Sequence, residues 1–304
     1  MDVLLRNAFQ SLGRSRSANK LARKYGLRFG ASRFVAGETI RQAIEAVRKL
    51  NASGRAATLD HLGEFVAGAE EANESAAMCL RTLDAIEEAG VFCNLSLKLT
   101  SLGLDIDREV CFRNIRSILD RARQYGNFVR IDMEDYAHCQ ATIDLYRGLR
   151  RSFDNVGIVI QAYLYRSERD LEELRELRPN LRLVKGAYKE SPKVAFPDKK
   201  DVDDNYRKLV RMQLLSGQYA AVATHDERLV EYAKQLMAEH GLPKEKMEFQ
   251  MLYGIADELQ LRLVREGFKV RVYVPYGTDW FGYFMRRLAE RPANAGFVLK
   301  NLFK

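Results

Sequence analysis

The feature that most constrains the fold of this chain is a regular alternation of strand-like and helical segments after residue 55. Eight segments have the apolar and β-branched content of strands, and they cover residues 56–63, 92–100, 127–135, 156–164, 180–188, 219–226, 247–254 and 269–277. Helically spaced apolar residues lie between them, and a last helical segment follows the eighth strand at 279–294. Strands that alternate with helices form parallel sheets, and eight such units in about 250 residues match a (β/α)8 barrel. The sequence therefore predicts an α/β fold of the TIM-like (β/α)8 class.

The first 55 residues differ from the rest in charge. Residues 1–36 contain eight basic residues and one acidic residue, which accounts for most of the net charge of +8. Apolar residues at Ile40, Ile44 and Val47 have helical spacing. We therefore divide the chain into an N-terminal basic helical arm (1–55) and a barrel (56–304). The nearly neutral barrel is not expected to bind nucleic acid. The arm either contacts anionic lipid or nucleic acid, covers a partner subunit, mimics a targeting segment, or docks on its own fold.

Composition and motifs exclude several classes of protein. No run approaches the ~20 apolar residues that cross a bilayer, and no signal-peptide core is present. Four cysteines are scattered without CxxC spacing, which is typical of reduced thiols and predicts a cytoplasmic protein. No GxGxxG segment follows a strand, no P-loop occurs, and the four histidines form no metal-binding motif. The sequence therefore predicts no Rossmann or P-loop nucleotide site and no metal.

Polar residues recur where the predicted strands end. The residues concerned are Lys98, Asp132, Gln161, Arg182, Lys185, His225, Gln250 and Tyr273. Because the carboxyl ends of barrel strands meet at one mouth, we expect these side chains to lie near one another. His225 in this group has two interpretations, as a catalyst or as a packing residue, and the sequence leaves both open.

The predicted mouth is rich in cations. Such a mouth suits an anionic substrate together with an electron-accepting cofactor, and a flavin favours positive charge near its ring. Arg286 and Arg287, one turn after Tyr283, form either a solvated face or a clamp for a carboxylate or phosphate. Two other functions remain open: a Schiff-base enzyme that uses Lys98 or Lys185, and a catalytically silent binding protein.

Seven segments in the same order resemble proline dehydrogenase, in its stand-alone bacterial form. They are LSLKLTSLG, RIDMED, QAYL, LRLVKGAY, ATHD, EFQMLYG and RVYVPYGTDWFGYFMRRLAERPAN. The resemblance implies a distorted (β/α)8 barrel that holds FAD without a Rossmann fold. It also implies oxidation of L-proline to Δ1-pyrroline-5-carboxylate by hydride transfer from C5 to flavin N5, with electrons passed to a quinone. This reaction is the first step of proline catabolism to glutamate.

The resemblance also implies roles for particular residues. Arg286, Arg287 and Lys98 match the cations around the proline carboxylate, Tyr273, Tyr283 and Leu252 match the residues around the pyrrolidine ring, and Asp132 and Arg182 match a pair beside the flavin. The matching flavin contacts are Met133, Gln161, Arg182, Val184, Lys185, Gly186, Ala187, Thr224, His225, Gln250 and Glu290. Two positions bear on these roles: Lys189 stands where many members have tryptophan, and the bulk of Tyr273 favours proline over hydroxyproline.

Overall fold

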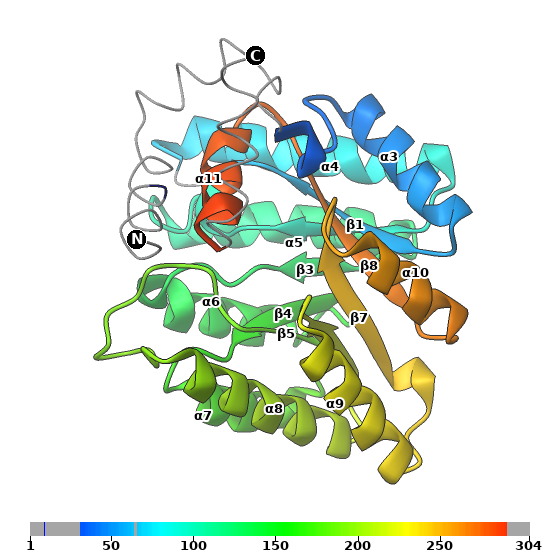
Figure 1. The fold of residues 1–304 in the computed structure, drawn as a ribbon. Coiled ribbons are helices and arrows are strands. Elements are labelled where there is room, and N and C mark those ends of the chain that lie inside the picture. The colour runs from blue at the N-terminus through cyan, green and yellow to red at the C-terminus, as the bar shows by residue number, and fades with distance from the viewer. Residues whose placement is uncertain (1–8, 10–30, 64–65, 291–304) are drawn as a thin grey trace.

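Eight parallel strands pair in chain order and close into a barrel, in a computed structural model that describes residue 9 and residues 31–63 and 66–290 (Figure 1). The strands are β1 (Ala56–His61), β2 (Cys93–Leu97), β3 (Val129–Ile131), β4 (Val156–Gln161), β5 (Leu181–Val184), β6 (Ala220–Ala223), β7 (Met247–Leu252) and β8 (Val270–Tyr276). The α-helices are α3 (Ile40–Ala52), α4 (Ala69–Ala89), α5 (Arg108–Gln124), α6 (Tyr136–Leu149), α7 (Ser167–Leu174), α8 (Lys199–Leu215), α9 (Glu227–Glu239), α10 (Asp257–Arg265) and α11 (Trp280–Glu290). The predicted (β/α)8 barrel is therefore confirmed.

Every strand lies inside the range that the sequence predicts for it, but most strands end earlier than predicted. The second strand ends at Leu97, so Lys98 is the first residue after it, and the third ends at Ile131, just before Asp132. Apolar residues continue to alternate beyond these positions, at Leu99 and Met133, so the sequence pattern does not mark where the two strands end. The polar residues that follow bond to side chains of other strands, and they belong to the loops of the barrel mouth.

Alternation along each strand separates the barrel wall from its interior. In β3, Val129 and Ile131 belong to the apolar cluster that the helices cover, so Arg130 between them faces inward. The same reasoning places Arg182, Glu248 and Arg271 inside, and all of these charged side chains are buried. Barrel interiors usually contain branched apolar side chains. This interior instead contains a charged network.

The helix ring is closed by α3, which precedes the barrel in the chain. Its buried residues pack in one cluster with outward residues of β1 and β8, such as Leu59 and Val272. The last helix, α11, packs instead with the 3-10 helix Ala31–Arg33 (η2), with Leu62 after β1, and with Ile255 after β7. It therefore lies at the carboxyl end of the barrel, where its side chains can reach the mouth. Figure 1 shows α3 and α11 as separate helices.

The loop after β7 fits closely against η2. Gly254 has φ +73°, and a Cβ atom at this position would overlap the carbonyl oxygen of Arg33. The Arg33 Nε also donates to the Gly254 carbonyl oxygen at 3.4 Å. Because Leu252 ends β7 just before this loop, the contact ties the segment before the barrel to one edge of the mouth.

We expect Gly254→Ala to destabilise the fold for two reasons. A left-handed non-glycine residue costs about 1 kcal/mol, and the displaced Arg33 backbone adds about 1–3 kcal/mol of overpacking. Gly217→Ala is a matched control, because Gly217 has φ +74° and nothing lies within 4 Å of its Cβ position. Urea unfolding of both variants measures the difference, and equal losses would contradict close packing at Gly254.

Candidate active site

Asp132, the residue after β3, is the centre of a buried polar cluster at the mouth. Its Oδ1 accepts from the Ser96 hydroxyl at 2.7 Å and from Arg182 Nη1 at 2.5 Å. Its Oδ2 accepts from the Tyr273 hydroxyl at 2.9 Å and lies 3.6 Å from Lys98 Nζ. Burial would raise the pKa of Asp132, but the charges of Arg182 and Lys98 outweigh burial and hold the pKa below its usual value. The side chain is therefore an ionised acceptor.

A second carboxylate, Asp60 of β1, belongs to the same cluster, and sequence reasoning did not select it. Its Oδ2 accepts from Lys98 Nζ at 2.8 Å and from the Tyr273 hydroxyl at 2.5 Å. Burial raises the pKa of Asp60, although Lys98 acts in the opposite direction. A signal was present: Asp60 is the one acid of the predicted strand 56–63, and it stands two residues after Thr58, in the same inward register.

Arg182 is fixed from below by a column of hydrogen bonds inside the barrel. Its Nε donates to Gln250 Oε1 at 2.5 Å, and Gln250 Nε2 donates to Glu248 Oε1 at 2.5 Å. Glu248 in turn accepts from Arg271 Nε at 2.9 and 3.1 Å. Burial would raise the pKa of Glu248, but Arg271 and Lys269 outweigh burial and lower it to about 2. The guanidinium also lies 5.4 Å from the centre of the Tyr273 ring, so its orientation is determined on several sides.

The cofactor residues implied by the resemblance lie at the ends of β3 to β7. Gln161 ends β4 and donates through Nε2 to the carbonyl oxygen of Glu134 at 2.8 Å. The other residues are Met133 after β3, Val184 at the end of β5, Lys185, Gly186 and Ala187 in the loop that follows, Thr224 and His225 after β6, and Gln250 in β7. These positions form one arc of the mouth. Glu290 ends α11, and its side chain lies outside the described residues.

Lys185 is held by carboxylates from two neighbouring elements. Its Nζ lies 2.6 Å from Asp203 Oδ1 of α8 and 3.1 Å from Asp226 Oδ2 after β6. Burial would raise the pKa of each acid, but Lys185 and Lys199 outweigh burial and lower it. Much of the positive charge that the sequence suggests at Lys185 is therefore neutralised.

His225 links the ends of β6 and β7. Its Nε2 accepts the backbone N–H of Leu252 at 2.9 Å. A backbone N–H can only donate, so Nε2 is unprotonated and Nδ1 carries the ring proton. Of the two interpretations, this contact favours a positioning role, because the ring fixes the backbone of Leu252.

The helix α11 packs against this cluster, because Tyr273 packs with the apolar residues of the helix. Arg287 is 9% exposed, and its guanidinium lies 5.0 Å from the centre of the Tyr283 ring. The Arg286 guanidinium lies 5.7 Å from the centre of the Tyr188 ring, in the loop after β5. The two adjacent arginines therefore point to different partners, and neither belongs to a fully solvated face.

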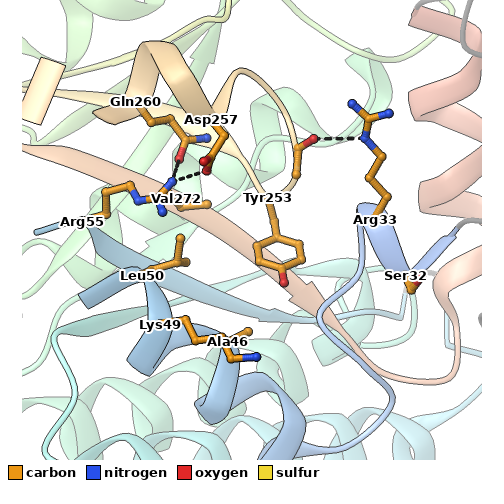
Figure 2. Close-up of a pocket in the computed structure, with 11 residues that line it drawn as sticks. Ser32, Arg33, Ala46, Lys49, Leu50, Arg55, Tyr253, Asp257, Gln260 and Val272 are labelled. Atoms are coloured by element: carbon orange, nitrogen blue, oxygen red, sulfur yellow. Dashed lines mark hydrogen bonds and ion pairs between the residues drawn. The ribbon is translucent and has the colours of Figure 1, made fainter. Parts of the chain in front are cut away.

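A pocket of about 330 Å³ lies elsewhere, outside the barrel wall (Figure 2). Its lining includes Leu50 of α3, Tyr253 after β7, and Val272, whose side chain faces away from the interior. Arg55 points into it and is paired with Asp257 and with Gln260 Oε1 at 2.8 Å (Figure 2). The lining shares no residue with the Asp132 cluster, so this pocket is separate from the barrel mouth. Among the described residues, no group of His, Cys, Asp or Glu side chains is arranged to hold a metal ion.

Known proteins match almost the whole chain. The family profile described as "Proline dehydrogenase" matches residues 43–300. Proline dehydrogenase 1 of Bacillus subtilis is 54% identical over 301 residues, which cover 99% of this chain and 100% of that protein. Proline dehydrogenase of Deinococcus radiodurans is 44% identical over 309 residues, which cover 100% of this chain and 99% of that protein.

A solved structure matches the fold. The crystal structure of proline utilization A (PutA) from Bdellovibrio bacteriovorus, inactivated by N-propargylglycine, has a TM-score of 0.81 and 26% identity. The match covers 87% of this chain and 33% of that chain, so this chain spans about a third of the PutA chain.

Proposed function

Because the chain belongs to the proline dehydrogenase family and is an oxidoreductase that acts on proline, we propose that it oxidises L-proline to Δ1-pyrroline-5-carboxylate with bound FAD. The observation that carries this proposal is the buried cluster of Asp132, Arg182, Lys98 and Tyr273. The helix α11, which bears the two arginines, packs against this cluster at Tyr273. The cluster offers cations for a carboxylate and an aromatic ring for a saturated five-membered ring.

The chemistry of the residues at the mouth fits a flavin. Arg182 offers a fixed positive charge, which a flavin ring favours, and its Nε donates to the Gln250 amide in β7. A second amide, that of Gln161, ends the neighbouring strand β4. His225 presents a protonated Nδ1, and Gly186 has φ +123°, which leaves backbone without a side chain at the mouth. The residues that would hold FAD are these together with Met133, Val184, Lys185, Ala187, Thr224 and Glu290. FAD would supply the hydride acceptor.

The chain's own residues would bind and orient proline. Arg286, Arg287 and Lys98 would hold the carboxylate, because charge-assisted hydrogen bonds are strong and forked guanidinium groups fix its plane. Tyr273, Tyr283 and Leu252 would enclose the ring, which fixes the face that C5 presents. The bulk of Tyr273 would favour proline over hydroxyproline. Trp280, 1% exposed, and Phe284, 2% exposed, pack behind Tyr283 in the same cluster and would exclude water.

The Schiff-base alternative has less support. A lysine that attacks a carbonyl needs a neutral amine. Lys98 forms an ion pair with Asp60 at 2.8 Å, and Lys185 forms ion pairs with Asp203 and Asp226. Both amines are therefore already bound to carboxylates.

The first test of the proposed function is an absorbance spectrum of the purified protein, before and after anaerobic addition of L-proline. We expect a flavin band that proline bleaches, because oxidation of the substrate reduces the cofactor. Nucleotide analysis of the released cofactor distinguishes FAD from FMN. If no flavin is present even after incubation with FAD, the cofactor proposal is wrong. If the flavin band is present and proline leaves it unchanged, the substrate proposal is wrong.

The arginine clamp has a separate test. Arg286→Met and Arg287→Met should each weaken the apparent binding of proline by about 2–4 kcal/mol, roughly 30-fold to several hundred-fold in KM. Flavin content should stay close to that of the unchanged protein. Arg265→Met, at an exposed position of α10, is the matched control. An unchanged KM in either clamp variant would contradict a carboxylate role for that arginine.

We propose further that a membrane quinone accepts the electrons and that the cytoplasmic enzyme reaches it through the basic arm. No helix within residues 31–63 and 66–290 is long and apolar enough to cross a membrane. Residues 1–36 of the arm contain eight basic residues and one acidic residue. The protein should sediment with anionic phospholipid vesicles at low salt and separate from them at high salt. A chain without residues 1–30 is the control. Equal sedimentation of both chains would argue against the arm, and a reduced flavin that a water-soluble quinone does not reoxidise would argue against the acceptor.

A further inference from the structure

Asp60 is a buried acid at the mouth, and its hydrogen bonds to other described residues run to Lys98 and Tyr273 of the proposed substrate site. It is 1% exposed, and its Oδ2 is bonded to Lys98 Nζ and to the Tyr273 hydroxyl. We propose that Asp60 is a positioning residue for proline: its carboxylate holds Lys98 and Tyr273 in the orientation in which they meet the substrate, and it keeps Asp132 available to Arg182. This inference rests on the proposed function.

The first argument is the balance of charge in the cluster. Lys98 and Arg182 are buried cations, and Asp60 and Asp132 are buried carboxylates. Lys98 Nζ is 2.8 Å from Asp60 Oδ2 but 3.6 Å from Asp132 Oδ2. Each cation thus has its own close carboxylate. Without Asp60, the Lys98 ammonium would be drawn toward Asp132, which already binds Arg182, because opposite charges attract strongly in a buried site.

The second argument concerns the hydroxyl of Tyr273. Its oxygen lies 2.5 Å from Asp60 Oδ2 and 2.9 Å from Asp132 Oδ2, and a tyrosine has one hydroxyl proton to donate. The carboxylate of Asp60 therefore helps decide which way the hydroxyl points. If Asp60 were removed, the Tyr273 hydroxyl would donate its proton to Asp132 instead. The tyrosine would then lose the contact that holds its hydroxyl on the side of Lys98.

The groups around Asp60 make its role dependent on pH. Lys98 after β2, Asp132 after β3 and Tyr273 from β8 face it. The charge of Asp60 also acts on Cys79 of α4 and on Tyr276 of β8. Burial raises the pKa of Asp60, so its ionised form is lost at a higher pH than for an ordinary aspartate. Lys98 then loses its anchor as the pH falls. Asp60 should therefore contribute to the acid limb of the pH profile of kcat/KM.

The test compares Asp60→Ala, Asp60→Asn and the control Thr58→Ala in the flavin-bound protein. Thr58 is 1% exposed and lies two residues earlier in the same inward register, so its loss reports on packing alone. We expect Asp60→Ala to raise the KM for proline at least ten-fold and to move the acid limb to lower pH, with flavin content unchanged. Asp60→Asn should move the acid limb in the same direction. The Kd of cyclopentanecarboxylate, which lacks the ring nitrogen of proline, gives a binding readout that needs no turnover, and it should rise in both variants.

The outcomes are separable. If KM, Kd and acid limb in Asp60→Ala equal those of Thr58→Ala, Asp60 does not position the site. If Asp60→Ala fails to fold, Asp60→Asn decides, because it keeps the shape of the side chain: a moved acid limb supports the proposal and an unmoved one overturns it. If the unchanged protein does not oxidise proline, both the proposed function and this inference are wrong.

Discussion

The ion pair between Arg182 and Asp132 is the interaction on which the rest of the mouth depends. Arg182 belongs to β5, and Asp132 is the residue after β3. Each is held by further bonds, Arg182 to Gln250 and Asp132 to Ser96 and Tyr273. Buried ions are costly unless their geometry is fixed and their remaining hydrogen-bonding groups are satisfied. The column through Glu248 and Arg271 meets that condition below the pair. The barrel interior thus contains charged and polar side chains in place of apolar ones, and these side chains orient the Arg182 guanidinium.

The path of the chain around the barrel brings the arginines of α11 to the mouth. The helix after β8 of a regular barrel packs on the wall beside β8 and β1. Here α3 occupies that position, and its residues Ile44 and Val47 pack there with Leu59 and Val274. The last helix is therefore available to lie over the carboxyl ends of the strands. The segment before the barrel thus closes the wall and contacts the loop after β7 through Gly254.

Sequence patterns predict the wall of this barrel better than its interior. Alternating apolar residues and helical spacing identified all eight strands, because outward positions are covered by helices and must be apolar. The cluster of mouth cations was also visible, because charged residues stood out at strand ends. Asp60 was missed because a single acid in a strand, although visible in the sequence, does not reveal its buried partners, Lys98 after β2 and Tyr273 in β8. Pairing of Lys185 with Asp203 and Asp226 likewise depends on how α8 packs, which no local spacing specifies.

The charges of the mouth suggest why an anionic substrate would complete it. Lys98, Arg182, Asp60 and Asp132 balance one another, and Lys185 is matched by its own carboxylates. The surroundings shift the pKa values of the two acids in opposite directions. Burial raises the pKa of Asp60, while neighbouring cations lower the pKa of Asp132. The charges added by α11 are Arg286 and Arg287, which stack on Tyr188 and Tyr283. A bound carboxylate would offset part of the positive charge of these two arginines. The negative charge of the substrate and the positive charge at the mouth are therefore complementary.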